Sequence, residues 1–117
     1  MNIFQHFFAY LRLREAVRKA DKAHSKTGER YYVMPSFGSR QLLVMDRKNF
    51  RLLKQKHYIK LQAMVSNLVV ESFYFTPYRN GSGWLNESDR RHKVRQYFAW
   101  YNSELRKARQ ARKSKKK

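Results

Sequence analysis

The fold class is decided by one stretch, RYYVMPSFGSRQLLVM, which occupies residues 30–45. Its two ends, residues 30–34 and 41–45, are rich in aromatic, β-branched and long apolar residues, which favour strands. Between them, Pro35, Gly38 and two serines are typical of a turn. The stretch therefore predicts a two-stranded β-hairpin. Because two strands alone are marginal in water, helices must cover them, and we expect a small α+β domain.

A long helix is predicted before the hairpin. Asn2 can cap its start, and Gly28 is a plausible end after Thr27. Its apolar side is broad around a phenylalanine-rich segment: Phe4, Phe7, Phe8 and Leu11. The opposite side and the later turns are basic: Arg12, Arg18, Lys19, Lys22 and Lys26. We expect the apolar side to pack against the core and the other side to form a cationic stripe.

Three more helices are expected after the hairpin. Asp46 can cap a short helix from Arg47 to Lys56, with Phe50 and Leu53 pointing inward. Residues 61–75 contain many strand formers but also a helix-capping pattern, and we favour a helix there. After a loop at residues 76–83, rich in glycine and containing a proline, the last helix begins at one of two capping residues, Asn86 or Ser88.

The chain ends in a run of basic residues. Residues 106–117 include eight of the 27 Lys and Arg and no acid. We expect the last helix to fray into this run, so that residues 1–105 form a single α+β domain and residues 106–117 a disordered basic tail.

Charge points to the class of partner. The chain has 27 Lys and Arg against 8 Asp and Glu, a formal net charge of +19 on 117 residues. Such an excess favours a polyanionic partner, and nucleic acid is the commonest one. The 42% hydrophobic and 15% aromatic content indicates a folded chain rather than a disordered polycation. With no cysteine, disulfides and thiolate zinc sites are excluded.

We predict largely sequence-independent binding, with single-stranded DNA or RNA preferred over duplex. Tyr31 and Tyr32 are adjacent in a predicted strand, so their side chains face opposite sides of the sheet. We expect one of the two to offer an exposed ring for base stacking. The residues predicted to bind nucleic acid are Arg47, Lys48, Arg51, Lys54, Lys56, Arg79, Arg106, Lys107, Arg109, Arg112, Lys113, Lys115, Lys116, Lys117, Tyr31 and Tyr32.

No catalytic or metal-binding pattern is visible. The four histidines are scattered, and several of the eight acids occupy expected helix starts or ion pairs, so we expect neither an enzyme, a metal nor a cofactor. A ribonuclease using His57 has no support from residue spacing.

Two other functions stay open. The phenylalanine-rich helix can lie on an anionic membrane surface, or the cations can bind an acidic protein. No stretch is long and apolar enough for a membrane span, and a cytoplasmic location is expected.

Several segments resemble a known group of proteins. They are GERYYVMP at residues 28–35, LVMDRKNFR at residues 43–51, and FTPYRNG at residues 75–81. These segments look like small basic proteins encoded by gut bacteriophages, above all single-stranded DNA phages of the microvirus type that infect Bacteroidales. The resemblance covers about residues 16–100. It implies a use for a compact cation that binds single-stranded DNA during replication or packaging, in the host cytoplasm or the virion. A host-directed inhibitor that binds an acidic protein is the alternative role in this context.

Overall fold

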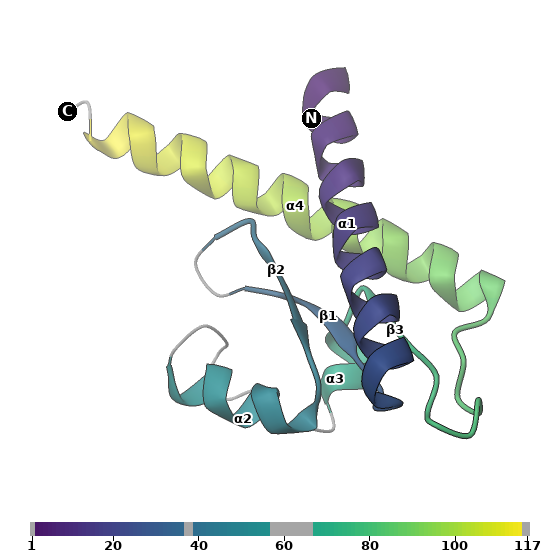
Figure 1. Ribbon diagram of the computed structural model, residues 1–117. Coiled ribbons are helices and arrows are strands. Elements are labelled where there is room, and N and C mark those ends of the chain that lie inside the picture. The colour runs from purple at the N-terminus through teal and green to yellow at the C-terminus, as the bar shows by residue number, and fades with distance from the viewer. Residues whose placement is uncertain (1, 37–38, 57–66, 116–117) are drawn as a thin grey trace.

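The structure, a computed structural model, describes residues 2–36, 39–56 and 67–115. It has four helices and three strands in the described residues, and the predicted α+β class is confirmed (Figure 1). In chain order the elements are α1 (Ile3–Thr27), β1 (Tyr32–Pro35), β2 (Leu42–Met45), α2 (Arg47–Gln55), α3 (Asn67–Glu71), β3 (Tyr74–Phe75) and α4 (Glu87–Lys115).

The strands form one small antiparallel sheet in the order β2-β1-β3. The predicted hairpin is confirmed, with Tyr32 opposite Met45 and Pro35 opposite Leu42. Strand β3 was not predicted. The favoured helix over residues 61–75 is wrong at its end, because α3 stops at Glu71 and the chain then pairs with β1. Residues 61–66 of that prediction lie outside the described residues.

The strand formers of this segment explain the switch from helix to strand. The Phe73 N–H donates to the Val33 carbonyl at 2.8 Å, and the Thr76 N–H donates to the Tyr31 carbonyl at 3.0 Å. Aromatic side chains fit a pleated, half-buried surface better than a helix. A tertiary partner, strand β1, therefore decides the conformation that the local pattern leaves ambiguous.

The caps predicted for the first, second and last helices are confirmed. The Asn2 side chain accepts a hydrogen bond from the Gln5 N–H at 2.8 Å, and Gly28 adopts a left-handed conformation with φ 76°. The Asp46 carboxylate caps α2 by accepting from the Asn49 N–H at 2.8 Å. Of the two residues proposed to begin the last helix, Asn86 is the cap, because its side chain accepts from the N–H three residues on at 2.8 Å. Each cap satisfies a backbone donor that the helix itself leaves unpaired.

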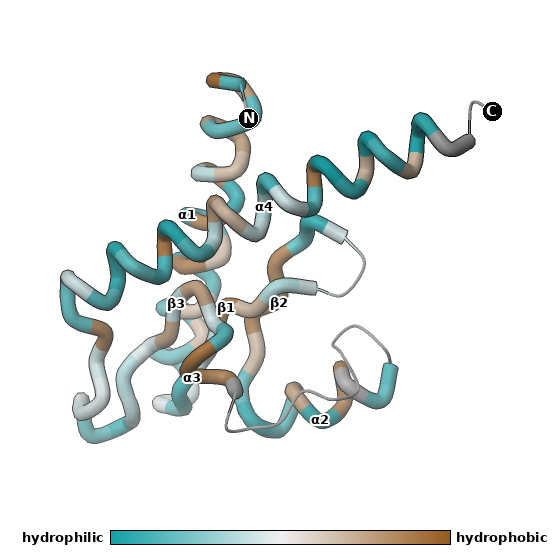
Figure 2. Tube along the Cα trace, turned by 180° about the vertical axis from the view of Figure 1, so that it is seen from behind, coloured by the Kyte–Doolittle hydropathy of each residue, from teal (hydrophilic) through white to brown (hydrophobic). Residues whose placement is uncertain are grey.

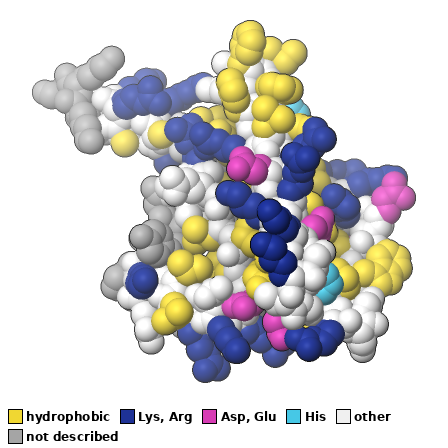
Figure 3. Space-filling model, in the orientation of Figure 1, with side chains coloured by type: hydrophobic (Ala, Val, Ile, Leu, Met, Phe, Trp, Pro, Cys, Tyr) yellow, Lys and Arg dark blue, Asp and Glu magenta, His cyan; other side chains and the backbone are white. Residues whose placement is uncertain are grey.

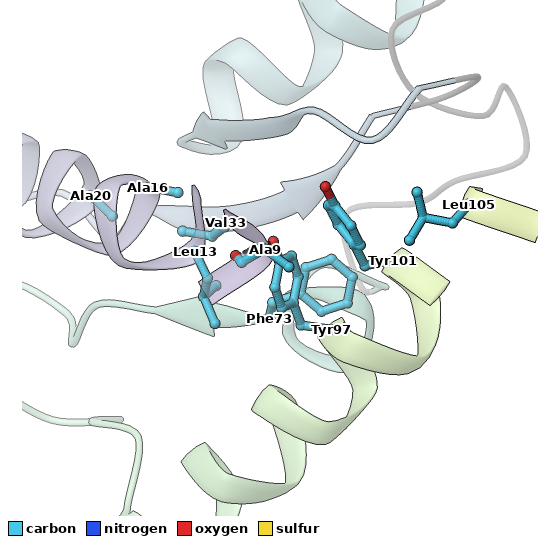
Figure 4. Packing of buried hydrophobic residues seen from close by; sticks show 9 residues of the cluster. All are labelled: Ala9, Leu13, Ala16, Ala20, Val33, Phe73, Tyr97, Tyr101 and Leu105. Carbon is cyan, nitrogen blue, oxygen red and sulfur yellow. Dashed lines mark hydrogen bonds between the residues drawn. The ribbon is translucent and has the colours of Figure 1, made fainter. Parts of the chain in front are cut away.

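The two faces of the sheet are buried against different helices, since successive residues of a strand point to opposite sides. On one face, Val33 packs with residues of α1 and α4 (Figure 4). On the other face, Tyr32 and Met34 pack with Phe50 of α2 and Leu68 of α3. In Figure 2, hydrophobic residues are concentrated in the strands and in α3. The helices therefore cover both sides of the sheet.

Helix α1 packs through small residues instead of its phenylalanines. Its buried positions are Ala9, Leu13, Ala16 and Ala20, which we call the alanine seam. Contrary to the sequence-based expectation, the side chains of Phe4 and Phe7 are 71% and 57% exposed. The seam lets α1 come close to α4, where the Tyr97 hydroxyl donates to the Ala9 carbonyl at 2.6 Å. Small residues permit this close approach, and bulkier side chains are turned outward.

Helix α4 extends further than the sequence predicted. Where a disordered tail was expected from Arg106, the helix continues to Lys115, and residues 116–117 lie outside the described part. Leu105 is its last buried side chain among the described residues. Alanines, arginines and lysines, all good helix formers, explain the extension. Figure 1 shows the end of α4 projecting past the hairpin.

One lysine is used inside the fold. Lys93 is 7% exposed, and its ammonium donates to the carbonyls of Val69 and Ser72 at 2.6 and 2.7 Å. These two carbonyls lie at the end of α3, where the backbone carbonyls of a helix have no N–H partner within the helix. Burial lowers the pKa of the Lys93 ammonium below its ordinary value. This cation therefore stabilises the packing of α3 on α4 and is not available to a ligand.

Replacing Tyr97 with phenylalanine should destabilise the protein. The substitution keeps the ring but leaves the buried Ala9 carbonyl without its donor, so we expect a loss of about 1–2 kcal/mol in the free energy of unfolding. Urea unfolding followed by circular dichroism measures it. Tyr10→Phe is the matched control, because Tyr10 is half exposed, and its effect should stay within about 0.5 kcal/mol. Equal effects of the two substitutions would contradict this role of Tyr97.

Two tyrosines should ionise late. Burial raises the pKa of Tyr97, and burial together with a hydrogen bond to Asp21 raises the pKa of Tyr74. The unfolded chain releases these protons near pH 10, about the ordinary value. Their contribution to stability is therefore complete below that pH and is lost as the pH rises through the folded-state values. Phenolate absorbance should show a late phase that is missing in a Tyr74→Phe/Tyr97→Phe variant.

Candidate nucleic-acid interface

A row of cations lies along the solvent side of α1. Arg14, Arg18, Lys22 and Lys26, here called the α1 row, follow one another at four-residue spacing, and all four are exposed. Residues four apart lie above one another on a helix, and this row lies opposite the alanine seam. Among the described residues, none of the four forms a salt bridge with a carboxylate. The row therefore presents four uncompensated charges along one line.

Other cations extend this positive surface. Figure 3 shows Lys and Arg side chains running down the middle of one face over α1, and gathered again along its lower edge and along α4 at the upper left. The acids that lie near cations are already engaged: Glu15 pairs with Lys19 at 3.5 Å, and Glu104 pairs with Lys107 at 3.3 Å. A polyanion could therefore contact cations from several elements at once.

The predicted cations of α2 and α4 are placed as follows. Arg47, Lys48, Arg51 and Lys56 are exposed in or just after α2, and Lys54 lies within that helix. Arg106, Lys107, Arg109, Arg112 and Lys113 are exposed on α4, which also contains Lys115. Lys116 and Lys117 lie outside the described residues. Helical geometry puts Arg106, Arg109 and Lys113 on one side of α4, at spacings of three and four. These cations therefore form a second row, held by the helix.

Tyr32 does not fit its predicted role as a stacking ring. It is only 2% exposed and packs in the core between the sheet and α2. Tyr31 is half-buried against the other core cluster, and its hydroxyl accepts a hydrogen bond from the Thr27 hydroxyl at 3.2 Å. Since helices cover both sides of the sheet, the sheet itself offers no open platform for bases.

Arg79 has a structural role that the sequence did not reveal. Its guanidinium donates to the Thr27 carbonyl at 2.8 Å and pairs with Glu29 at 3.1 Å, so it holds the end of α1. It lies in a hollow of about 710 Å³ between the loop at residues 78–82 and the start of α2. The exposed Arg47 and Lys48 line the same hollow. Among the predicted residues, the fold thus brings Arg79 together with the first cations of α2.

Arg30 lies at the same hollow and is packed between aromatic rings. Its guanidinium carbon is 4.0 Å from the centre of the Phe75 ring and 4.2 Å from that of Tyr78. It also donates to the Gly83 carbonyl at 2.8 Å. Stacking of this kind orients the loop at residues 76–83 against strand β3. The exposed Trp84 follows directly in the chain and offers a large free ring beside this loop.

A larger groove runs between α1, β2 and α4. It has a volume of about 870 Å³ and is lined by four cations and two acids: Arg12, Lys19, Arg40, Lys107, Glu15 and Glu104. The guanidinium carbons of Arg12 and Arg40 both lie 5.9 Å from the centre of the Tyr101 ring. The two acids are paired with the two lysines, so the two arginines carry the free charge of the groove. Its open shape suits a chain-like anion better than a small molecule.

The residues that the structure describes hold no cluster of three or more His, Cys, Asp or Glu able to bind a metal ion. His57, the histidine considered for a ribonuclease, lies outside them. No helix within the described ranges is both long and apolar enough to cross a membrane. No known protein family, curated protein or solved structure gives a significant match to this chain. The resemblance to phage proteins therefore stays a prediction.

The α1 row is the part of this positive surface to which the sequence analysis assigns no contacts. The cations of the first helix were recognised as a stripe, but nucleic-acid contacts were assigned to the cations of α2, to Arg79 and to the basic end of the chain. The four-residue spacing of the cations from Arg14 to Lys26 is the sequence pattern that indicates a row on one side of the helix. Arg40 of the groove stands alone in the turn and had no such signal.

Neutralising the α1 row should weaken nucleic-acid binding more than removing equal charge from the first half of α4. For Arg18→Gln/Lys22→Gln, we expect the slope of log affinity against log salt to become shallower by about 1.5–2, because each lost phosphate contact removes about 0.7–0.9. The charge-matched control is Arg91→Gln/Arg95→Gln, since Arg91 already pairs with Glu87 at 2.6 Å. Equal losses in both variants would show that net charge alone determines binding.

Proposed function

We propose that the protein binds nucleic acid without enzymatic chemistry, mainly by contacting phosphates. The observation that carries this proposal is the α1 row, four exposed cations on the side of α1 that faces away from the core. A rise of 1.5 Å per residue spreads them over about 18 Å. Within duplex DNA one strand presents a phosphate every 3.4 Å along the axis, so the row spans about five phosphates of such a strand.

The arrangement supports binding without sequence preference. The cations are long, exposed side chains at a helix surface, and contacts of such side chains with phosphates fix position but read no bases. The second row on α4 and the exposed cations of α2 add further phosphate contacts on other parts of the molecule. A nucleic acid that touches two of these elements must bend around the domain or lie across it.

We also propose a preference for single-stranded DNA or RNA. The aromatic support for it differs from the sequence-based expectation, since Tyr32 is buried and Tyr31 is half-buried. The partly exposed Tyr78 ring lies 4.2 Å from the Arg30 guanidinium carbon, and Trp84, which follows the Gly83 carbonyl that Arg30 contacts, is 66% exposed. An exposed indole and a tyrosine ring against a cation suit stacking on an unpaired base, which a duplex does not offer.

This activity fits the context that the phage resemblance implies, in which a compact cation accompanies single-stranded DNA through replication or packaging. An anionic membrane and an acidic protein are the competing partners, because both also attract a chain of charge +19. Specificity therefore has to be judged by comparing ligands at near-physiological salt, where screening weakens contacts that depend on charge alone.

The decisive test is fluorescence anisotropy with matched single-stranded DNA, single-stranded RNA, duplex DNA and heparin over a salt series. We expect single strands to bind most tightly at physiological ionic strength, and Trp84→Ala to remove that preference while leaving duplex binding unchanged. Binding that is equal for all four ligands and collapses together with salt would contradict a nucleic-acid function.

Removing charge from the end of α4 should weaken binding to every sequence alike. In Arg106→Gln/Arg109→Gln/Arg112→Gln/Lys113→Gln, glutamine preserves helix propensity while four phosphate contacts are lost. We expect the salt slope to become shallower by about 3–4. Circular dichroism confirms that the helix is kept. An unchanged slope would exclude the second row and the neighbouring Arg112 from the interface.

A further inference from the structure

The first turns of α1 carry an exposed apolar patch. It consists of Ile3, Phe4, Phe7, Phe8, Tyr10 and Leu11, which are 38–79% exposed and are here called the N-terminal patch. Figure 3 shows hydrophobic side chains gathered at the upper end of the face, and Figure 1 shows α1 projecting there beyond α4. A large exposed apolar patch on the surface of a folded protein usually marks an interaction site.

The patch continues the same side of the helix as the cations. Phe4, Phe7 and Leu11 lead at helical spacing into Arg14 and Arg18, so all five lie on the side opposite the alanine seam. The core is already complete without the phenylalanines, because the seam and α4 fill that side. The patch therefore has no role in the core among the described residues.

Charge distribution separates the patch from the rest of the surface. Residues 1–11 contain no Asp, Glu, Lys or Arg, although 30% of the whole chain is charged. The centres of protein interfaces show this combination, with charged residues depleted and aromatic residues enriched. The cations begin only at Arg12.

The size of the patch matches one half of a stable interface. With about 150–250 Å² for each fully exposed side chain of this size, the exposed fractions of the six residues give an area on the order of 500–900 Å². A standard protein interface buries about 800 Å² on each partner. Isolated apolar patches on monomers are usually smaller, at about 300–600 Å².

We propose that the N-terminal patch binds the same patch of a second copy of this chain. Two copies of charge +19 repel each other, and the patch is the part of α1 through which they can meet without placing cations face to face. A helix that lies on an anionic membrane carries Lys and Arg along its polar side, which these turns lack. A self-complementary contact between two identical helix segments gives a closed two-fold dimer.

The expected dimer responds to salt in the opposite direction to nucleic-acid binding. Screening reduces the repulsion between the copies while apolar burial is unaffected or strengthened, so the dimer fraction should rise with salt. Phosphate contacts weaken under the same conditions. Sedimentation equilibrium of nucleic-acid-free protein over a salt series therefore tests self-association independently of the proposed function.

Substitutions locate the contact. Phe4→Gln/Phe7→Gln/Phe8→Gln should shift the dimerisation constant by at least tenfold toward monomer, with the helix content unchanged, because all three side chains are exposed. The matched control is Val70→Gln/Trp84→Gln, since these two side chains are 67% and 66% exposed outside the patch. It should dimerise like the parent protein.

Cross-linking gives a second readout. The chain has no cysteine, so Phe7→Cys introduces a single thiol. Oxidation should link two copies through it, whereas Trp84→Cys should stay largely monomeric. A protein that remains monomeric at high salt and high concentration would overturn the proposal. So would phenylalanine-dependent binding of that monomer to vesicles containing phosphatidylglycerol, which would assign the patch to a lipid surface.

Discussion

The close contact of α1 with the sheet and α4 determines the layout of the molecule. Three of the four seam residues are alanines, and their small size lets the Tyr97 hydroxyl reach the Ala9 carbonyl. A helix that packs through alanines must turn its large side chains away from the core. The exposed phenylalanines and the exposed cations of α1 are therefore two results of one packing arrangement.

The few acids are mostly used within the fold, which leaves the cations uncompensated. Asp46 caps α2, Asp21 accepts a hydrogen bond from the Tyr74 hydroxyl at 2.6 Å, and Glu29 pairs with Arg79. Ion pairs between neighbouring turns account for Glu15, Glu87 and Glu104. Structural needs thus neutralise a small share of the positive charge, and the remainder shapes the field around the protein.

Local signals made much of the fold predictable. Asn2, Gly28, Asp46 and Asn86 mark helix ends through hydrogen bonds that each residue makes with its near neighbours, so the sequence alone places them. Strand β3 depends on a distant partner: Phe73 bonds to Val33 of β1 and Thr76 bonds to Tyr31 just before it, about 40 residues earlier in the chain. The prediction of which side of α1 is buried was wrong, because it considered the hydrophobicity of the side chains and not their size. Phenylalanine is the more hydrophobic residue, but only small residues such as alanine fit the narrow space between α1 and its neighbours. The roles of Arg79 and Arg30 also depend on loops that meet only in the folded chain.

The distribution of charge along α4 has a consequence for how the molecule meets other molecules. Its first turn carries Glu87 and Asp89, while the stretch after Glu104 contains only cations among its charged residues. The first two turns mix these acids with Arg90, Arg91 and Lys93, so the excess of positive charge lies toward the other end of a helix about 43 Å long. An uneven charge distribution gives the molecule a dipole moment, and the field of a polyanion exerts a torque on it before any contact is made. The far end of α4 is therefore the part of this helix that a polyanion attracts most strongly.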